Sequence, residues 1–219
     1  RSAVAECCRT IRTNLMFMST DNPLHTLVVT STGPREGKST TATSLAITMA
    51  QAGARTLLID TDMRRPRLHR SFQITNDVGI SSLILGQVDF SEAIQDVGVE
   101  NLDVMTCGPI PPNPAELLHT QAFARIMEDC KHKYDRVIFD SPPVGAVTDP
   151  VILGSMVDGL VLVVKAGETS WRAAAQAKER IEAVGGNIMG AVLNSLDLDD
   201  KSGAYGYSYY YYDKSGYTY

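Results

Sequence analysis

The chain has 219 residues, of which 44% are hydrophobic and 21% charged, and its formal net charge is −5. This composition is typical of a globular protein with enough apolar material for a sizeable core, and one domain is the default expectation. A mildly acidic chain lacks the clustered excess of lysine and arginine that a nucleic-acid surface needs, which argues against nucleic acid as a partner.

Four cysteines, Cys7, Cys8, Cys107 and Cys130, show neither a C-x-x-C spacing nor a nearby histidine pattern, so the sequence predicts neither a zinc site nor a disulfide framework. No apolar run reaches the roughly 18 to 20 residues that a membrane-spanning helix needs. The sequence begins at Arg1 and its first residues do not have the pattern of a signal peptide. We therefore expect reduced thiols in the cytoplasm, with any membrane anchor before Arg1 or on a partner.

Residues 2–19 are the first predicted helix, in which Glu6, Arg9 and Arg12 recur at three-residue steps along one side. A solvated face with ion pairs is one interpretation of this stripe. Six apolar, β-branched runs follow and are predicted strands: 26–31, 55–60, 101–106, 136–140, 159–164 and 188–194.

Helical patterns separate these runs. Between the first two, apolar residues recur at helical spacing from Ala42 to Met49, and Gly53 stands where a helix end is expected. Shorter helices are predicted within 79–85 and 91–97. The alternation predicts an α/β fold with a mostly parallel central sheet and helices on both faces.

The first predicted strand leads directly into STGPREGKST, residues 31–40, and then into a helix. A strand, a turn ending in Gly-Lys-Ser and a helix N-terminus together aim backbone N–H groups and a positive dipole end at one point, which favours a phosphate group. Lys38 is predicted to neutralise the β- and γ-phosphates of ATP, and the Ser39 hydroxyl to bind Mg²⁺. Thr32 stands where this motif usually has its first glycine, so Gly33 or a local rearrangement is expected to supply the tight turn.

The predicted nucleotide-binding residues are Gly33, Glu36, Gly37, Lys38, Ser39, Thr40 and Asn194. Asn194 ends the last predicted strand, where its side-chain amide can bind an adenine edge or simply belong to a turn.

Three aspartates follow predicted strands. Asp60 and Asp62 end LLIDTD, and Asp140 ends RVIFD. Ligands bind at the carboxyl edge of parallel sheets, and carboxylates beside a phosphate need a cation between them, so the pattern predicts Mg²⁺. We take Lys38, Asp60, Asp62 and Asp140 as catalytic candidates and Ser39, Asp62 and Asp140 as metal ligands. Asp60 is the candidate acceptor of a proton, although the roles of Asp60 and Asp62 are interchangeable at this stage, and capping of the next helix is the alternative for both.

Two segments remain. The run Arg64–Arg67 is either solvated surface or a contact for an activator or an acidic substrate. From Asp197 onward the hydrophobic periodicity stops, and 198–219 is predicted to be a flexible tail behind a domain at 1–197. The tail tyrosines are Tyr205, Tyr207, Tyr209, Tyr210, Tyr211, Tyr212, Tyr217 and Tyr219.

GPREGKST, LLIDTDMRRP and VIFDSPP, together with PPNPAELL at 111–118 and the tyrosine-rich tail, resemble the bacterial tyrosine kinases that accompany polysaccharide export. These are P-loop enzymes with Walker A, A′ and B motifs. The resemblance implies an ATP- and Mg²⁺-dependent protein-tyrosine kinase that autophosphorylates its tail, the eight tail tyrosines being the phosphoacceptors.

The resemblance also implies that Glu6, Arg9 and Arg12, on an N-terminal helix within 1–20, form an oligomerisation motif of a ring. It further implies a membrane-embedded activator, fused or on a separate chain, a place at the inner face of the cell membrane, and possible substrates among other proteins. The 23 residues from Asp197 are long enough when extended to reach a neighbouring subunit, which makes transfer in trans feasible.

Two alternatives remain at this stage. A partitioning or division-type P-loop switch ATPase usually has a lysine just after the first Walker A position, and Gly33 stands there in this chain. A binding module without turnover, with the tyrosines as an adhesive strand, is disfavoured by the glycines and serines between them.

Overall fold

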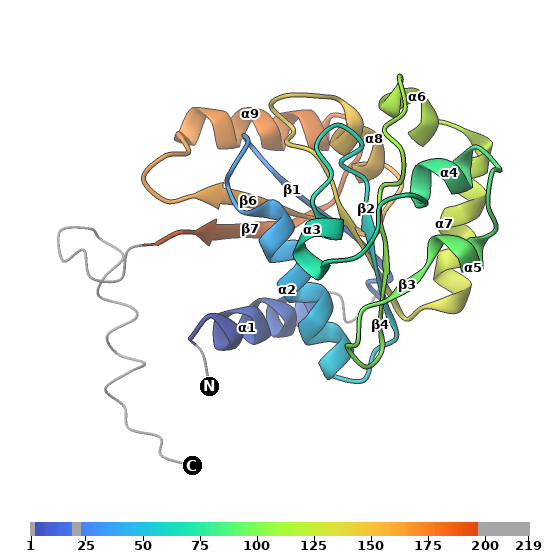
Figure 1. Cartoon of the computed structure of the whole chain (residues 1–219). Coiled ribbons are helices and arrows are strands. Elements are labelled where there is room, and N and C mark those ends of the chain that lie inside the picture. Colours follow the sequence, from blue (N-terminus) through green and yellow to red (C-terminus); the bar gives the residue numbers. More distant parts are fainter. Residues whose placement is uncertain (1–2, 19–22, 197–219) are drawn as a thin grey trace, which may run out of the picture.

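The computed structural model describes residues 3–18 and 23–196, which build a seven-stranded sheet flanked by helices (Figure 1). The strands are β1 (Thr26–Ser31), β2 (Thr56–Asp60), β3 (Gln95–Asp96), β4 (Leu102–Met105), β5 (Arg136–Asp140), β6 (Gly159–Lys165) and β7 (Ile188–Asn194). The helices are α1 (Ala3–Met18), α2 (Lys38–Gln51), α3 (Leu68–Phe72), α4 (Ile80–Ile84), α5 (Phe90–Ala93), α6 (Pro114–Leu118), α7 (Gln121–Lys133), α8 (Asp149–Gly154) and α9 (Trp171–Glu182).

The sheet has the order β3-β4-β2-β5-β1-β6-β7. Every neighbouring pair is parallel except β3 and β4, which are antiparallel. Parallel neighbours require crossover connections, and helices provide them here. The predicted fold class, a mostly parallel sheet between helices, is confirmed.

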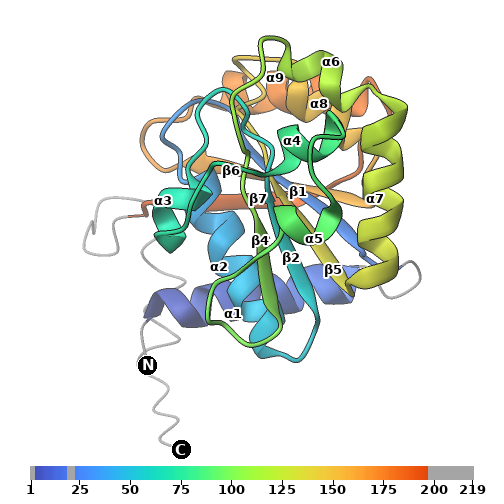
Figure 2. The same ribbon diagram turned by 45° about the vertical axis from the view of Figure 1, so that its right-hand side comes forward.

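The side chains of successive residues in a strand belong to two separate cores, one on each face of the sheet. Val28 and Leu57 belong to the core beneath α4 to α9, whereas Val29 and Leu58 belong to the core beneath α1, α2 and α3. Figure 2 shows α2 and α3 on one side of the sheet and α4, α5 and α7 on the other. Because side chains alternate between faces of a strand, two covered faces produce the continuous apolar runs seen in the sequence.

The six predicted strands agree with β1, β2, β4, β5, β6 and β7 to within one residue at each end. The helix predicted within 91–97 is wrong in its second half. Helix α5 ends at Ala93, and Gln95 and Asp96 pair with Val104 and Asp103 of β4. Helix α2 ends at Gln51, and Gly53 follows with φ of +92°, as the residue past a helix end often does.

Asp158, in the turn before β6, clamps the start of β1. One carboxylate oxygen accepts hydrogen bonds from the backbone N–H of His25 (2.9 Å) and of Thr26 (2.7 Å), and from the Thr26 hydroxyl (2.9 Å). The Thr26 hydroxyl in turn accepts the N–H of Asp158 at 2.9 Å. This clamp fixes the point from which β1 runs toward the phosphate loop.

We predict that Asp158→Ala lowers the free energy of unfolding by about 1–3 kcal/mol, because two backbone N–H groups and a hydroxyl lose their acceptor. Urea denaturation measures the change. Glu168→Ala is the control, because it removes only an exposed pair with Lys165 and should change stability by less than about 0.5 kcal/mol. Equal effects of the two substitutions would contradict the clamp.

Candidate active site

The loop between β1 and α2 closes on itself through the Glu36 side chain. This carboxylate accepts hydrogen bonds from the N–H of Thr32 (2.8 Å), the N–H of Gly33 (3.0 Å) and the Thr32 hydroxyl (2.6 Å). The hydroxyl of Thr169, in the loop after β6, donates to the same carboxylate. Because protein donors already bind the carboxylate, we expect any contact of Glu36 with a nucleotide to be made by its backbone N–H.

The sharp turn of this loop is made at Arg35 and Gly37, whose φ values are +66° and +95°. Gly33 does not have a positive φ, so of the two expectations for the tight turn the local rearrangement, and not Gly33, agrees with the structure. Thr32 fits that position because its buried hydroxyl has a partner. Glycine is favoured at 37 because residues with a Cβ rarely adopt a φ of +95°, and a Cβ there would also lie 2.0 Å from Nδ2 of Asn194, which would have to move.

Helix α2 begins at Lys38, directly after this turn, and no side chain caps its first turn. Its free N–H groups and dipole therefore form a site suited to an anion. Asn194, at the end of β7, donates from Nδ2 to the Glu36 carbonyl at 2.9 Å and so lies beside the loop. Its contact with an adenine stays a prediction. Thr40 is exposed, whereas Ser39 is half-buried, with its hydroxyl 3.3 Å from Lys38 Nζ.

The Lys38 ammonium lies between two predicted acids. Its Nζ is 2.8 Å from Oδ2 of Asp62 and 3.4 Å from Oδ1 of Asp140. Burial by itself lowers the pKa of Lys38, but the nearby carboxylates of Asp140 and Asp62 outweigh it and raise this pKa above its ordinary value. Lys38 is therefore charged at neutral pH.

Asp60 is fully buried, and backbone N–H groups hold both of its carboxylate oxygens. Oδ2 accepts from Arg67 (2.8 Å) and Leu68 (2.9 Å), and Oδ1 accepts from Asp62 (3.2 Å). Burial, with the charge of Asp140 added, raises the pKa of Asp60 to about 7, although these hydrogen bonds oppose the shift. Asp60 therefore organises the segment that follows β2.

Asp140, at the end of β5, is fully buried, and its Oδ2 has no hydrogen-bond partner. Burial raises its pKa, while the Lys38 ammonium opposes the shift. An unpartnered carboxylate oxygen among three acids and one lysine fits a cation. Among the described residues, no group of three or more His, Cys, Asp or Glu side chains could hold a metal alone.

The sequence did not predict two contacts of the site. Arg64 makes a bidentate pair with the buried Asp149, with Nε–Oδ2 and Nη2–Oδ1 distances of 3.0 and 3.1 Å. This pair joins the segment after β2 to the N-terminus of α8. The second is the Thr169 hydroxyl on Glu36. Both join residues more than 80 positions apart in sequence, so no local pattern indicates them.

The three-residue stripe on α1 divides into two parts. Arg9 pairs with Glu6 at 2.6 Å on the helix surface. Arg12 instead donates from Nη1 to the carbonyl of Thr48, in the last turn of α2, at 2.7 Å. Arg12 thus satisfies a carbonyl at the C-terminal end of the helix that Lys38 begins.

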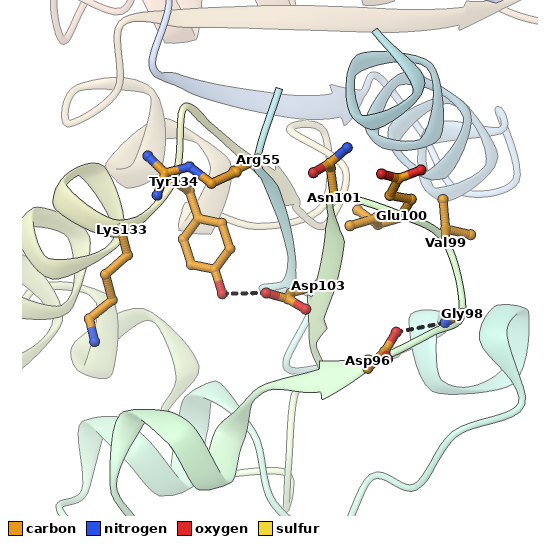
Figure 3. A pocket seen from close by; sticks show the side chains of 10 residues that line it. Arg55, Asp96, Gly98, Val99, Glu100, Asn101, Asp103, Lys133 and Tyr134 are labelled. Carbon is orange, nitrogen blue, oxygen red and sulfur yellow. Dashed lines mark hydrogen bonds between the residues drawn. The ribbon is translucent and has the colours of Figure 1, made fainter. Parts of the chain in front are cut away.

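A pocket of about 460 Å³ has neither Lys38 nor the three aspartates in its lining. Figure 3 shows the residues that line it. Arg55 and Asn101, which precede β2 and β4, belong to its lining, together with Tyr134, whose hydroxyl donates to Asp103 at 2.7 Å. It therefore lies at the amino ends of the parallel strands. Lys38 and the three aspartates lie at the carboxyl ends, which is the edge where such sheets bind ligands.

The tail tyrosines Tyr205 to Tyr219 and the predicted boundary at 197/198 lie outside the described residues. Within 3–18 and 23–196, no helix is both long and apolar enough to span a bilayer.

Comparison with known proteins places this geometry in a family. A model of an AAA domain matches residues 33–189. Tyrosine-protein kinase YwqD of Bacillus subtilis is 44% identical over 207 residues, which cover 94% of this chain and 87% of that protein. The kinase domain of Escherichia coli tyrosine kinase ETK is 34% identical with a TM-score of 0.87, covering 92% of this chain and 78% of that one. The chimerical protein CapA2B2 is 41% identical, also with a TM-score of 0.87, covering 90% and 86%.

A plasmid partition protein from Borrelia burgdorferi is 18% identical, with a TM-score of 0.63 over 78% of each chain, and shares the fold alone. The tyrosine kinases are therefore the nearer group in both sequence and structure, and the partitioning alternative is not favoured. With its P-loop, its three aspartates at one sheet edge and these similarities over nearly the whole described chain, the protein belongs to the bacterial tyrosine-protein kinases of P-loop NTPase-like fold.

Proposed function

We propose that this chain transfers phosphate from ATP to the tyrosines of its own C-terminal segment, in trans between subunits of a ring. The observation that carries the proposal is the Lys38 ammonium, which lies within 2.8 Å of Asp62 and 3.4 Å of Asp140 at the N-terminus of α2. Phosphoryl transfer depends mainly on positioning and on neutralising the charge of the phosphates, and this edge of the sheet supplies both.

The site residues then divide the work. The backbone N–H groups from Gly37 to Thr40 and the Lys38 ammonium bind the phosphates. Ser39 and Asp140 would hold Mg²⁺, which would supply positive charge to offset that of the phosphates. The unpartnered oxygen of buried Asp140 supports this assignment.

Asp62 is the better candidate to accept the proton of the tyrosine hydroxyl, whose ordinary pKa is near 10. Asp60 is enclosed and its oxygens hold three backbone N–H groups, whereas only one backbone N–H, that of Arg65, is bound to Asp62. The remaining oxygen of Asp62 contacts Lys38, which can turn to the phosphates instead. This reverses the first choice made from the sequence.

The wider setting is also part of the proposal. The resemblance to kinases of polysaccharide export supports a role in exopolysaccharide or capsule synthesis, with a transmembrane activator that brings the kinase to the inner face of the membrane. Each phosphate adds about −1.5 to −2 charges, so a multiply modified tail adds strong repulsion to an already acidic subunit and weakens the ring.

Trans transfer is tested by mixing two full-length chains. One carries Lys38→Met and keeps its tail tyrosines, and the other is active but has its eight tail tyrosines replaced by phenylalanine. We expect phosphotyrosine on the Lys38→Met chain after incubation with Mg²⁺ and ATP, detected by mass spectrometry. Either chain alone is the control. Absence of phosphotyrosine on the Lys38→Met chain would rule out transfer in trans. ATP hydrolysis without phosphotyrosine by the unsubstituted chain would show a switch ATPase and refute the kinase proposal.

The division between Asp62 and Asp60 is tested by asparagine substitutions. We expect Asp62→Asn to lower kcat about 100-fold, which is in the range for loss of a general base. The free energy of unfolding should change by less than about 1 kcal/mol, because Lys38 still has its ion pair with Asp140. Asp60→Asn should lower the free energy of unfolding by about 1–3 kcal/mol. Backbone N–H groups donate to both oxygens of Asp60, and in asparagine an NH₂ group, which cannot accept them, replaces one of these oxygens. A larger kcat loss in a stable Asp60→Asn protein would restore the opposite assignment.

The ring role of α1 is tested at Glu6 and Arg9 separately from Arg12. We expect Glu6→Ala with Arg9→Ala to shift sedimentation from ring to smaller species, with stability changed by less than about 0.5 kcal/mol, because the pair is exposed. Arg12→Ala should also destabilise the subunit, since it removes the bond to the Thr48 carbonyl. Rings of wild-type size in the double variant would exclude this role for the pair.

A further inference from the structure

Four arginines lie in the seven-residue span 64–70, shortly after Asp62: Arg64, Arg65, Arg67 and Arg70. Such a concentration of positive charge is unusual in a chain whose net charge is −5. Arg64 is engaged by the bidentate pair with the buried Asp149. The other three, which we call the arginine cluster (Arg65, Arg67 and Arg70), are all exposed.

The guanidinium groups of the arginine cluster form no ion pair with any residue of 3–18 or 23–196. Other exposed arginines, Arg35, Arg125 and Arg172, also have no ion pair within the described residues, but they are far apart in the sequence, whereas the cluster has three within six residues. The cluster therefore presents three charges that the described part of the subunit leaves for another molecule.

Hydrogen bonds fix the cluster to the catalytic carboxylates. The N–H of Arg65 donates to Oδ1 of Asp62 at 3.0 Å, and the N–H of Arg67 donates to Oδ2 of Asp60 at 2.8 Å. Arg70 lies one helical turn further on, in α3, where its N–H donates to the Arg67 carbonyl. The same segment thus turns two carboxylates inward and three guanidinium groups outward at the edge where a tyrosine must approach.

A ligand for this cluster needs negative charge and a tyrosine close to it. The C-terminal segment 197–219 has four aspartates, Asp197, Asp199, Asp200 and Asp213, against two lysines, Lys201 and Lys214. Asp213 directly follows Tyr212, and Asp200 precedes Tyr205 by five residues, about 17 Å in an extended chain. Aspartates therefore stand both before the tyrosines and among them.

We propose that the arginine cluster is the substrate-recognition surface of this kinase, and that it binds the aspartates of the C-terminal segment of a second copy while one of its tyrosines enters the site. The inference rests on the proposed function and adds to it the residues that select the substrate. Arginine suits this role because its planar fork of donors can bind a carboxylate through two hydrogen bonds.

An anionic membrane surface also attracts exposed arginines. The peptide is favoured because the backbone N–H groups of Arg65 and Arg67 are bonded to Asp62 and Asp60, so the segment that carries the cluster is attached to the carboxylates of the proposed site. A membrane contact requires no such connection. The two occupants give different results in the experiment below.

The experiment measures transfer to the full-length Lys38→Met chain as acceptor. The enzyme is the full-length chain whose eight tail tyrosines are phenylalanine, with or without Arg65→Gln, Arg67→Gln and Arg70→Gln. Glutamine keeps the backbone N–H groups that bind Asp62 and Asp60. We expect the triple variant to raise the KM for the acceptor about 10-fold at low salt, with a smaller effect on kcat, and the difference to shrink at 0.5 M NaCl because salt screens exposed charges.

The matched control removes the same charge elsewhere, with Arg125→Gln, Lys131→Gln and Lys178→Gln on α7 and α9, and should change the KM less than 2-fold. On the acceptor, replacing the four aspartates by asparagine should raise the KM of the unsubstituted enzyme by a similar factor. The two sets of changes should not multiply when combined, because they remove the same contacts.

An unchanged KM in the arginine triple variant, or effects that multiply fully, would overturn the inference. Loss of binding to phosphatidylserine vesicles with an unchanged KM would assign the cluster to the membrane and also overturn it. If the enzyme with its arginines intact produces no phosphotyrosine at all, the proposed function itself fails and the inference falls with it.

Discussion

The site depends on how β5 lies between β1 and β2. Asp140 of β5 is opposite Asp60 of β2 and opposite Val29 of β1, two residues before the end of the strand that leads into the phosphate loop. All three strands are parallel, so their carboxyl ends meet at one edge and bring Lys38 within 2.8 Å of Asp62 and 3.4 Å of Asp140. Because side chains alternate along a strand, a slip of one residue would turn Asp140 or Asp60 to the opposite face. Both faces of the sheet are covered by helices, and this burial fixes the register.

This arrangement has an energetic cost. Asp60, Asp62 and Asp140 are buried, and Lys38 is the one cation that contacts them among the described residues. The pKa of Asp60 is raised to about 7, and the pKa of Asp140 is raised as well, first because both are buried. The chain compensates at Asp60 with three backbone N–H groups but leaves one oxygen of Asp140 without a donor. Strain of this kind is typical of functional sites, where a bound cation and phosphates complete the electrostatics.

The sequence predicted what local patterns determine. Apolar runs located six strands, and an aspartate or a Gly-Lys-Ser turn at their ends located the catalytic edge. It did not predict features that arise only when distant segments meet. The nucleotide contact of Glu36 stays a prediction, and the sequence did not indicate that its carboxylate accepts hydrogen bonds from Thr32, Gly33 and Thr169. The oligomerisation role of Arg12 also stays a prediction, and the sequence did not indicate its bond to the Thr48 carbonyl of α2. The two-residue strand β3 was read as helix because its pairing with β4 is a tertiary contact that outweighs local propensity.

In our proposals, catalysis and recognition are joined in the segment from Asp60 to Arg70. Its carboxylates face the phosphate loop and bind the backbone of Arg65 and Arg67, while the Arg64 pair with Asp149 ties the segment to α8. A ligand that pulls on the arginine side chains acts on the same short stretch of backbone that orients Asp60 and Asp62. Under the proposed recognition by the arginine cluster, binding of an acidic tail acts on the segment that carries Asp60 and Asp62.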